Sequence, residues 1–184
     1  FPIVILLAAI SCGACSSLME TSPTTDVAKE EILADAEGLQ VAMDGVYATM
    51  YNRLDFVAAN AHQCFGNMAV TLAADLMGAD MVQTAQGAGW FWKDYNYDQR
   101  SRYTSKIWRC YFTWKYFYEI ISNVNYIISA SETATGDENE ILCTTAQAYA
   151  ERAFSDFMLL QSFHQTFVGH EDLTVVPIYT APTS

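Results

Sequence analysis

The stretch RYTSKIWRCYFTWKYFYEIISNVNYIISA, residues 102–130, decides the fold class. Its apolar and aromatic side chains return at alternating steps of four and three residues, which is the spacing of one face of an α-helix. These positions are Ile107, Tyr111, Trp114, Tyr118, Ile121, Asn125 and Ile128. The pattern predicts one long helix from about residue 102 to 130, followed by the polar loop SETATGDEN.

A second long helix is predicted beyond that loop, from Glu138 to about Phe167. Small residues mark one face of its first half, and large apolar residues continue that face. The face consists of Ala146, Ala150, Ala153, Phe157, Leu160 and Phe167. Two long helices joined by a short loop form an antiparallel helical hairpin. Hairpins of this kind stack in tetratricopeptide-type arrays, although no strict sequence repeat is visible here.

The segment from 26 to 54 reads as a further helix, with Thr25 or Asp26 as its N-cap. Its apolar stripe is Ile32, Ala36, Leu39, Met43, Val46 and Met50. A short helix is predicted to end near Gly78, and LTVVPIYT at 173–180 is predicted to be extended. We therefore expect a mainly α fold of tetratricopeptide-like hairpins, an α-α superhelix, with few short extended segments.

Composition limits the classes of partner. The 184 residues are 52% apolar and 16% charged, which is too hydrophobic for a disordered chain. The formal net charge is -12 at pH 7. A phosphate backbone would be repelled by this charge, so nucleic acid is not an expected partner.

The first fifteen residues, FPIVILLAAISCGAC, contain an apolar run that is too short to span a bilayer, which needs about 20 residues as a helix. The run is typical of the apolar region of an export signal whose positive start is missing. Cys12 and Cys15 follow it as a C-x-x-C pair. A zinc site would need a second pair, and a redox motif would need a preceding strand. No second pair is present, because Cys64, Cys110 and Cys143 are isolated in the sequence. No strand is expected before Cys12 either, because the apolar run of the signal stands there.

A lipoprotein signal, cut before a cysteine that then carries acyl chains, explains this stretch best. Small residues precede both cysteines, Gly13 and Ala14 before Cys15 and Ser11 before Cys12, so lipidation is expected at one of the two, and only the family resemblance given below favours Cys15 over Cys12. The expected organisation is a signal peptide over 1–14, a lipidated tether over 15–25 and a helical domain over 26–184. We expect that domain to be the N-terminal part of a longer one.

Several segments, taken in order, resemble the SusD/RagB family of lipoproteins. They are CSSLMETSP (15–23), DGVYATMY (44–51), AADLMGADM (73–81) with GWFWKDYNYD (89–98), WKYFYEIISNVNYII (114–128), AQAYAERAFSDFMLLQSF (146–163) and VPIYTAP (176–182). The segment over 114–128 matches the family's Trp-x3-Tyr-x2-Ile-x3-Asn pattern at Trp114, Tyr118, Ile121 and Asn125. The segment over 146–163 matches a helix motif of the family at Ala148, Arg152, Ala153 and Phe157.

The resemblance implies a cell-surface lipoprotein that captures oligosaccharides, or peptides, and passes them to a TonB-dependent outer-membrane transporter of the SusC/RagA type. It implies an outer-membrane location facing the exterior, no covalent chemistry and no cofactor. The alternative is a helical-repeat scaffold lipoprotein that binds a protein partner without a small ligand.

The expected roles of single residues follow. Trp90, Trp92, Tyr95 and Tyr97 form an aromatic cluster that either contacts a ligand or partner or packs under a loop. Trp114 and Tyr118 are expected to be structural. Asn125, on an apolar stripe, should bind loop carbonyls, and Arg152 should form an ion pair with a carboxylate of another helix.

No catalytic or metal site is expected. His62, His164 and His170 lack a nucleophile motif or a metal-ligand spacing. A glycosidase pair among Asp75, Asp80, Asp94 and Asp98 cannot be established from spacing, because such a pair must flank a cleft. The three cysteines outside the signal are expected to be buried free thiols, and a disulfide between Cys110 and Cys143 is left open.

Overall fold

The computed structural model describes residues 29–97 and 108–182. It divides the chain into two units, residues 1–32 and residues 33–184. The short helix α2 (Lys29–Ile32) is the described part of the first unit, so the predicted signal peptide, Cys12, Cys15 and the tether lie outside the described residues.

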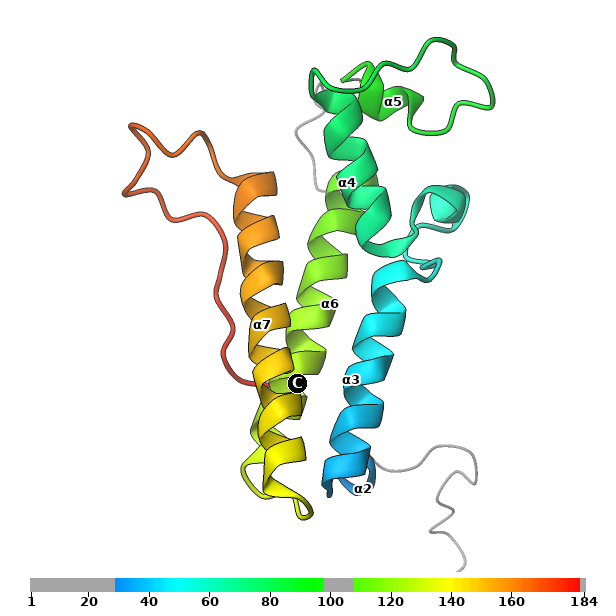
Figure 1. The fold of residues 1–184 in the computed structure, drawn as a ribbon. Helices are drawn as coiled ribbons and strands as arrows, with labels where there is room; N and C mark the ends of the chain where they lie inside the picture. Colours follow the sequence, from blue (N-terminus) through cyan, green and yellow to red (C-terminus); the bar gives the residue numbers. More distant parts are fainter. Residues whose placement is uncertain (1–28, 98–107, 183–184) are drawn as a thin grey trace, which may run out of the picture. The chain divides into compact units, whose positions relative to one another are not determined.

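The described regular elements of the second unit are all helices. Its elements are α3 (Ala36–Tyr51), the 3-10 helix η1 (Ala58–Gln63), α4 (Gly66–Met77), α5 (Trp92–Tyr95), α6 (Trp108–Ser131) and α7 (Glu138–Phe163). The helices α3, α6 and α7 run alongside one another, and α4 and α5 lie toward one end of them (Figure 1). No strand occurs within residues 29–97 and 108–182, and the predicted mainly α fold is confirmed.

The helix predicted over 26–54 is interrupted. α2 ends at Ile32 and α3 begins at Ala36, with Asp35 in an extended conformation as its N-cap. The Asp35 side chain accepts a hydrogen bond of 2.8 Å from the Gly38 amide. The backbone on either side of Asp35 pairs with Thr135 in the α6–α7 loop, so it is not free to continue a helix. The predicted caps, Thr25 and Asp26, lie outside the described residues.

The predicted hairpin of α6 and α7 is present, but the buried face of α6 differs from the predicted stripe. Tyr111 and Trp114 are exposed, whereas Ile121, Asn125 and Ile128 are buried as the stripe requires. The centre of the core face consists of Phe112, Tyr116, Phe117, Ile120, Val124 and Ile127. This helix is apolar on almost every side, so periodicity alone selected an edge of the buried face and not its middle. Ile107 lies outside the described residues.

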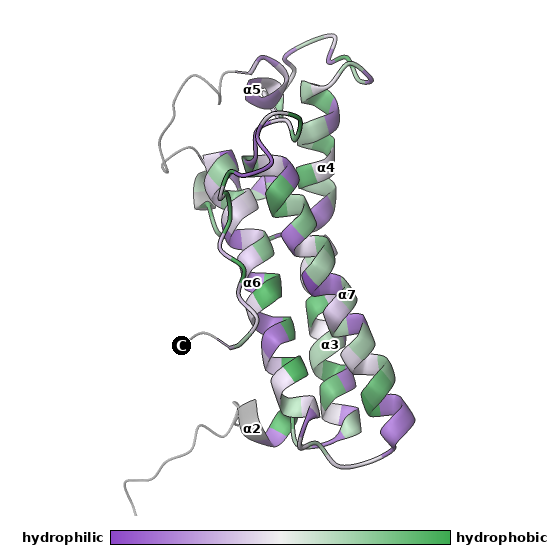
Figure 2. Ribbon diagram, turned by 90° about the vertical axis from the view of Figure 1, so that its left-hand side faces the viewer, coloured by the Kyte–Doolittle hydropathy of each residue, from purple (hydrophilic) through white to green (hydrophobic). Residues whose placement is uncertain are grey.

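The predicted apolar face of α7 points outward. Its members Ala146, Ala150, Ala153, Phe157 and Leu160 are all exposed, and Phe167 lies beyond the end of the helix. The buried face carries polar groups instead, namely Thr144 and Ser155, together with Ala148 and Leu159. Hydrophobic and hydrophilic stretches alternate along α3, α6 and α7 in Figure 2.

Polar pairs explain this inversion of α7. The Thr144 hydroxyl donates to Gln40 Oε1 of α3 over 2.9 Å, and the Tyr47 hydroxyl donates to Gln147 Oε1 over the same distance. Buried polar groups need such partners, and α3 supplies one for Thr144, whereas Ser155 Oγ is buried without a hydrogen-bond partner among the described residues. The contact between α3 and α7 is therefore partly polar, and the larger apolar side chains of α7 remain on its outer side.

Candidate functional site

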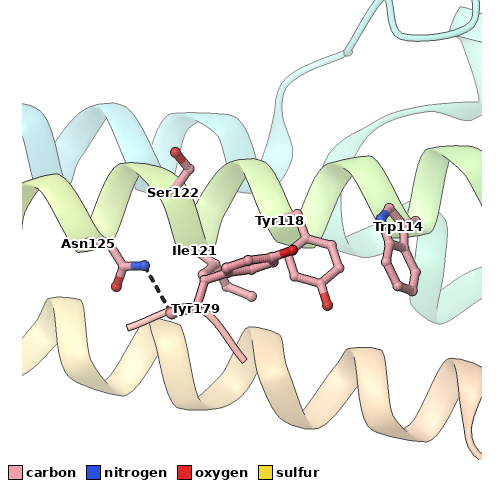
Figure 3. A pocket seen from close by; sticks show the side chains of 6 residues that line it. All are labelled: Trp114, Tyr118, Ile121, Ser122, Asn125 and Tyr179. Atoms are coloured by element: carbon pink, nitrogen blue, oxygen red, sulfur yellow. Dashed lines mark hydrogen bonds between the residues drawn. The ribbon is translucent and has the colours of Figure 1, made fainter. Parts of the chain in front are cut away.

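A pocket of about 240 Å³ lies against α6 (Figure 3). It is lined by Trp114, Tyr118, Ile121, Ser122, Asn125 and Tyr179, and we name it the aromatic pocket. Five of these residues come from α6 at helical spacing, so they share one side of that helix. The sixth comes from the chain beyond α7.

Three rings follow one another along this pocket. The centroids of Trp114 and Tyr118 are 4.7 Å apart in a tilted pair. Tyr118 and Tyr179 meet edge to face at 5.6 Å. Phe163, at the end of α7, meets Trp114 edge to face at 5.2 Å. These separations are those of favourable aromatic pairs, so the rings hold one another in place.

Residues 177–181, which we name the strap, bring Tyr179 to the pocket. The strap forms no strand or helix, and its carbonyl groups are bound by side chains of the hairpin. The Tyr118 hydroxyl donates to the Pro177 carbonyl over 2.8 Å. Asn125 Nδ2 donates to the carbonyls of Tyr179 over 2.9 Å and Ala181 over 3.3 Å. The dashed line in Figure 3 marks the first of these two bonds.

Arg152 of α7 completes this arrangement. Its Nη1 donates to Asn125 Oδ1 over 2.9 Å and to the Thr180 carbonyl over 3.4 Å. The buried amide of Asn125 thus uses its oxygen and its nitrogen, as a buried polar group requires. The loop carbonyls expected as partners of Asn125 are present. The ion pair expected for Arg152 is not what the described residues show, because its hydrogen-bond partners are an amide and a carbonyl.

The phenol of Tyr118 is held neutral. Burial raises its pKa to about 12, and the nearby Tyr179 and Asp156 act in the same direction because their negative forms repel a phenolate. Tyr118 therefore remains a hydrogen-bond donor to the strap at neutral pH. None of the described residues that line the aromatic pocket carries a formal charge.

The predicted cluster Trp90, Trp92, Tyr95 and Tyr97 lies on α5 and its flanks and does not form one platform. Trp90 is exposed and packs on His62 at 5.0 Å, while Trp92 and Tyr95 pair with each other at 5.8 Å. Tyr95 packs against the core, and the Tyr97 hydroxyl donates to the Met77 carbonyl.

A buried ion pair, which the sequence did not reveal, anchors this end of the second unit. Arg109 binds Asp94 through two hydrogen bonds, from Nε over 3.2 Å and from Nη2 over 3.0 Å. Arg109 Nη1 also donates to the Gln63 carbonyl over 3.1 Å, which ties α6 to η1 and α5. The residue pattern around Asp94 gave no indication of the ion pair, because Arg109 and Asp94 come into contact only in the folded chain.

The cysteines differ from the prediction in part. Cys64, Cys110 and Cys143 are free, so Cys110 and Cys143 form no disulfide. Cys64 is buried as predicted, but Cys110 and Cys143 are exposed. Within the described ranges, no group of three His, Cys, Asp or Glu side chains is placed to hold a metal ion. In the same ranges, none of the helices has both the length and the hydropathy for crossing a membrane.

Sequence reasoning named Trp114, Tyr118, Asn125 and Arg152 but did not place them in one site. It missed Ser122 and Tyr179. Ser122 was detectable in principle, because it lies at positions i+4 and i+8 from Tyr118 and Trp114 on the same helix. Tyr179 carried no such signal, because it contacts residues more than fifty positions away in the chain.

Comparisons with known proteins find no matching family model, no matching curated protein and no matching solved structure.

Proposed function

We propose that the chain belongs to a cell-surface lipoprotein of the SusD type, which captures oligosaccharides or peptides and delivers them to a TonB-dependent outer-membrane transporter. The proposal starts from the sequence resemblance. Lipid attachment at Cys15, or at Cys12, would anchor the protein to the outer membrane with the helical domain facing the exterior.

One structural observation supports it above the others. Three of the segments that carry the resemblance, 114–128, 146–163 and 176–182, are separate in the sequence, yet residues of each meet in one place. Tyr118 and Asn125 of α6, Arg152 of α7 and the strap, which lies within the VPIYTAP segment, form a single hydrogen-bonded group.

The site also has the chemistry of a binding site for neutral ligands. The aromatic pocket offers ring faces, a hydroxyl of Ser122 and no charge. Ring faces give a large contact area at low entropic cost, which suits sugars and apolar side chains.

A second candidate function, a scaffold lipoprotein that binds only a protein partner, is favoured by a different observation. The outer face of α7, formed by Leu142, Ala146, Tyr149, Ala150, Ala153, Phe157 and Leu160, is exposed and uncharged. Such a face is what a neighbouring helix covers when hairpins stack.

Binding measurements on the native full-length lipoprotein separate these functions. Calorimetry against a panel of oligosaccharides and short peptides should show binding, and purification after mild solubilisation should recover the transporter. Recovery of a protein partner with no binding to any panel member would favour the scaffold. Failure of both measurements would contradict both functions.

The anchor is tested separately by mass spectrometry. Acyl chains are expected on Cys15, and Cys15→Ser should release the protein from membranes while Cys12→Ser should not. The reverse result would move the lipid to Cys12, and an unmodified chain in both cases would contradict the surface location.

A further inference from the structure

The aromatic pocket is too small for a whole oligosaccharide. Its volume of about 240 Å³ lies below the range of roughly 300–1,000 Å³ that is usual for drug-sized ligands. A single six-membered ring fits this scale, so the ligand would present one unit to the pocket while its remainder stays outside.

The lining matches a ring with apolar faces and a polar edge. Trp114, Tyr118 and Tyr179 supply rings in a row along α6 in Figure 3, and Ile121 also lines the pocket. Ser122 supplies a hydroxyl to the same lining. A pyranose has this character, because its C–H faces are apolar and its hydroxyls project from the edge.

Charge excludes the main alternatives. The described lining residues include no cationic group that would bind a phosphate or a carboxylate, and the chain has a net charge of -12. A cationic ligand would find no carboxylate among the lining residues. Arg152 and Asp156 lie next to the lining residues Asn125 and Tyr118 but are not part of the lining, so a neutral ring suits the lining best.

We propose that the aromatic pocket is a subsite for one neutral pyranose ring, with the Tyr179 side chain as the wall that the strap holds in place. This inference rests on the proposed capture of oligosaccharides and assigns one part of that ligand to one place. Tyr179 is 43% exposed, which leaves part of it available for contact with the ring.

Asn125 and Arg152 act in this subsite as positioning residues. Asn125 uses its amide oxygen for Arg152 and its amide nitrogen for two strap carbonyls, so it fixes the backbone that carries Tyr179. Tyr118 fixes the other end of the strap through Pro177. The wall is therefore held by side chains of both helices of the hairpin.

The test titrates the full chain with methyl glycopyranosides of glucose, galactose and mannose, and with phenol as a neutral ring without edge hydroxyls. The readout is the indole N–H resonance of Trp114 in ¹⁵N spectra, assigned by comparison with Trp114→Phe. At least one glycoside should shift this resonance, and it should do so at a lower concentration than phenol. Tighter binding of phenol than of every glycoside would overturn the proposal.

Variants of the wall supply the second part of the test. Tyr179→Ala should weaken glycoside binding at least tenfold, and Tyr179→Phe, which keeps the ring, should bind as the wild type does. Tyr51→Ala, which removes an exposed tyrosine at the end of α3, is the matched control and should change nothing. An unchanged affinity in Tyr179→Ala would overturn the subsite.

Oligosaccharide binding by the same variants separates the subsite from the proposed capture function. If the wild type binds an oligosaccharide and Tyr179→Ala binds it equally well, the subsite is wrong while the capture function stands. If the wild type binds neither oligosaccharide nor glycoside, the capture function fails as well.

Discussion

Arg152 of α7 donates a hydrogen bond to Asn125 of α6 over 2.9 Å, and this bond fixes which way the Asn125 amide faces. With its oxygen taken by Arg152, the amide turns its nitrogen toward the carbonyls of the strap. The two helices of the hairpin thus act together on a segment that has no regular structure of its own.

Replacing Asn125 with alanine should lower the free energy of unfolding by about 2 kcal/mol, because three hydrogen bonds of a buried side chain are lost and their partners are left unpaired. Urea unfolding measures this change. The matched control is Asn123→Ala, two positions earlier on the exposed side of α6. Alanine is a better helix former there, so the control should not lose stability. Equal losses in both variants would contradict the role assigned to Asn125.

Replacing Arg109 with methionine should lower the free energy of unfolding by about 3–5 kcal/mol, because it removes the cationic partner of a buried carboxylate. The Arg109 and Asp94 side chains are only 7% and 1% exposed. The pair Arg53–Asp55, at 65% and 70% exposure, offers the contrast. Arg53→Gln should cost less than about 1 kcal/mol, as is usual for surface pairs. Thermal and urea unfolding of both variants decide between these values, and a small loss in Arg109→Met would show that Asp94 is not held by this pair.

Alanine should have opposite effects at two glycines. Gly66 begins α4 with φ +61°, and a Cβ there would collide with the Met50 carbonyl, so Gly66→Ala should destabilise by more than about 1–2 kcal/mol. Gly45 lies within α3, where a Cβ would meet nothing within 4 Å, so Gly45→Ala should stabilise by about 0.5–1 kcal/mol. Unfolding measurements that gave the two changes the same sign would refute this prediction.

The stability of the fold should depend on pH through Glu151, whose Oε2 is buried without a hydrogen-bond partner in the described part of the chain. Burial raises the pKa of this carboxyl. The folded state therefore keeps a proton that the unfolded chain has released, and the free energy of unfolding falls as pH rises through the raised pKa. Glu151→Gln removes this loss. Its free energy of unfolding should therefore exceed that of the wild type at pH 7, and this difference should disappear below about pH 4.

Urea unfolding at both pH values tests this, with Glu132→Gln in the exposed α6–α7 loop as the charge-matched control. An advantage of Glu151→Gln that did not change with pH, or that appeared equally in Glu132→Gln, would count against a buried carboxyl.

Neighbouring leucines of α7 should respond differently to alanine. Leu159 is fully buried, so Leu159→Ala should lower the free energy of unfolding by about 2–5 kcal/mol, because a cavity is left. Leu160 is 44% exposed on the outer face and should cost far less. Unfolding of the two variants checks which face of α7 is inside, and the opposite order would restore the face expected from the apolar pattern.

The sequence alone determined the long helices and some of their ends, but not the break before α3, the short helices η1 and α5, or the end of α7 at Phe163. Asp137 caps α7 just before the predicted start at Glu138, and Gly78 ends α4 where the glycine was expected to end it. These features are local, because caps and helical periodicity depend on residues within four positions of one another. The long helices on either side of a short polar loop likewise required a hairpin.

Only the tertiary structure decided which faces are buried and which residues meet. An apolar stripe in the sequence identifies one face of a helix but does not tell whether that face is buried. In α7 the apolar face is exposed, because Gln40 and Tyr47 of α3 form hydrogen bonds with the polar side of α7. The contacts of Tyr118 and Asn125 with the strap, and of Arg109 with Asp94, join residues that no helical period relates. Such contacts form only when packing brings distant segments together, so a pattern of neighbours could not contain them.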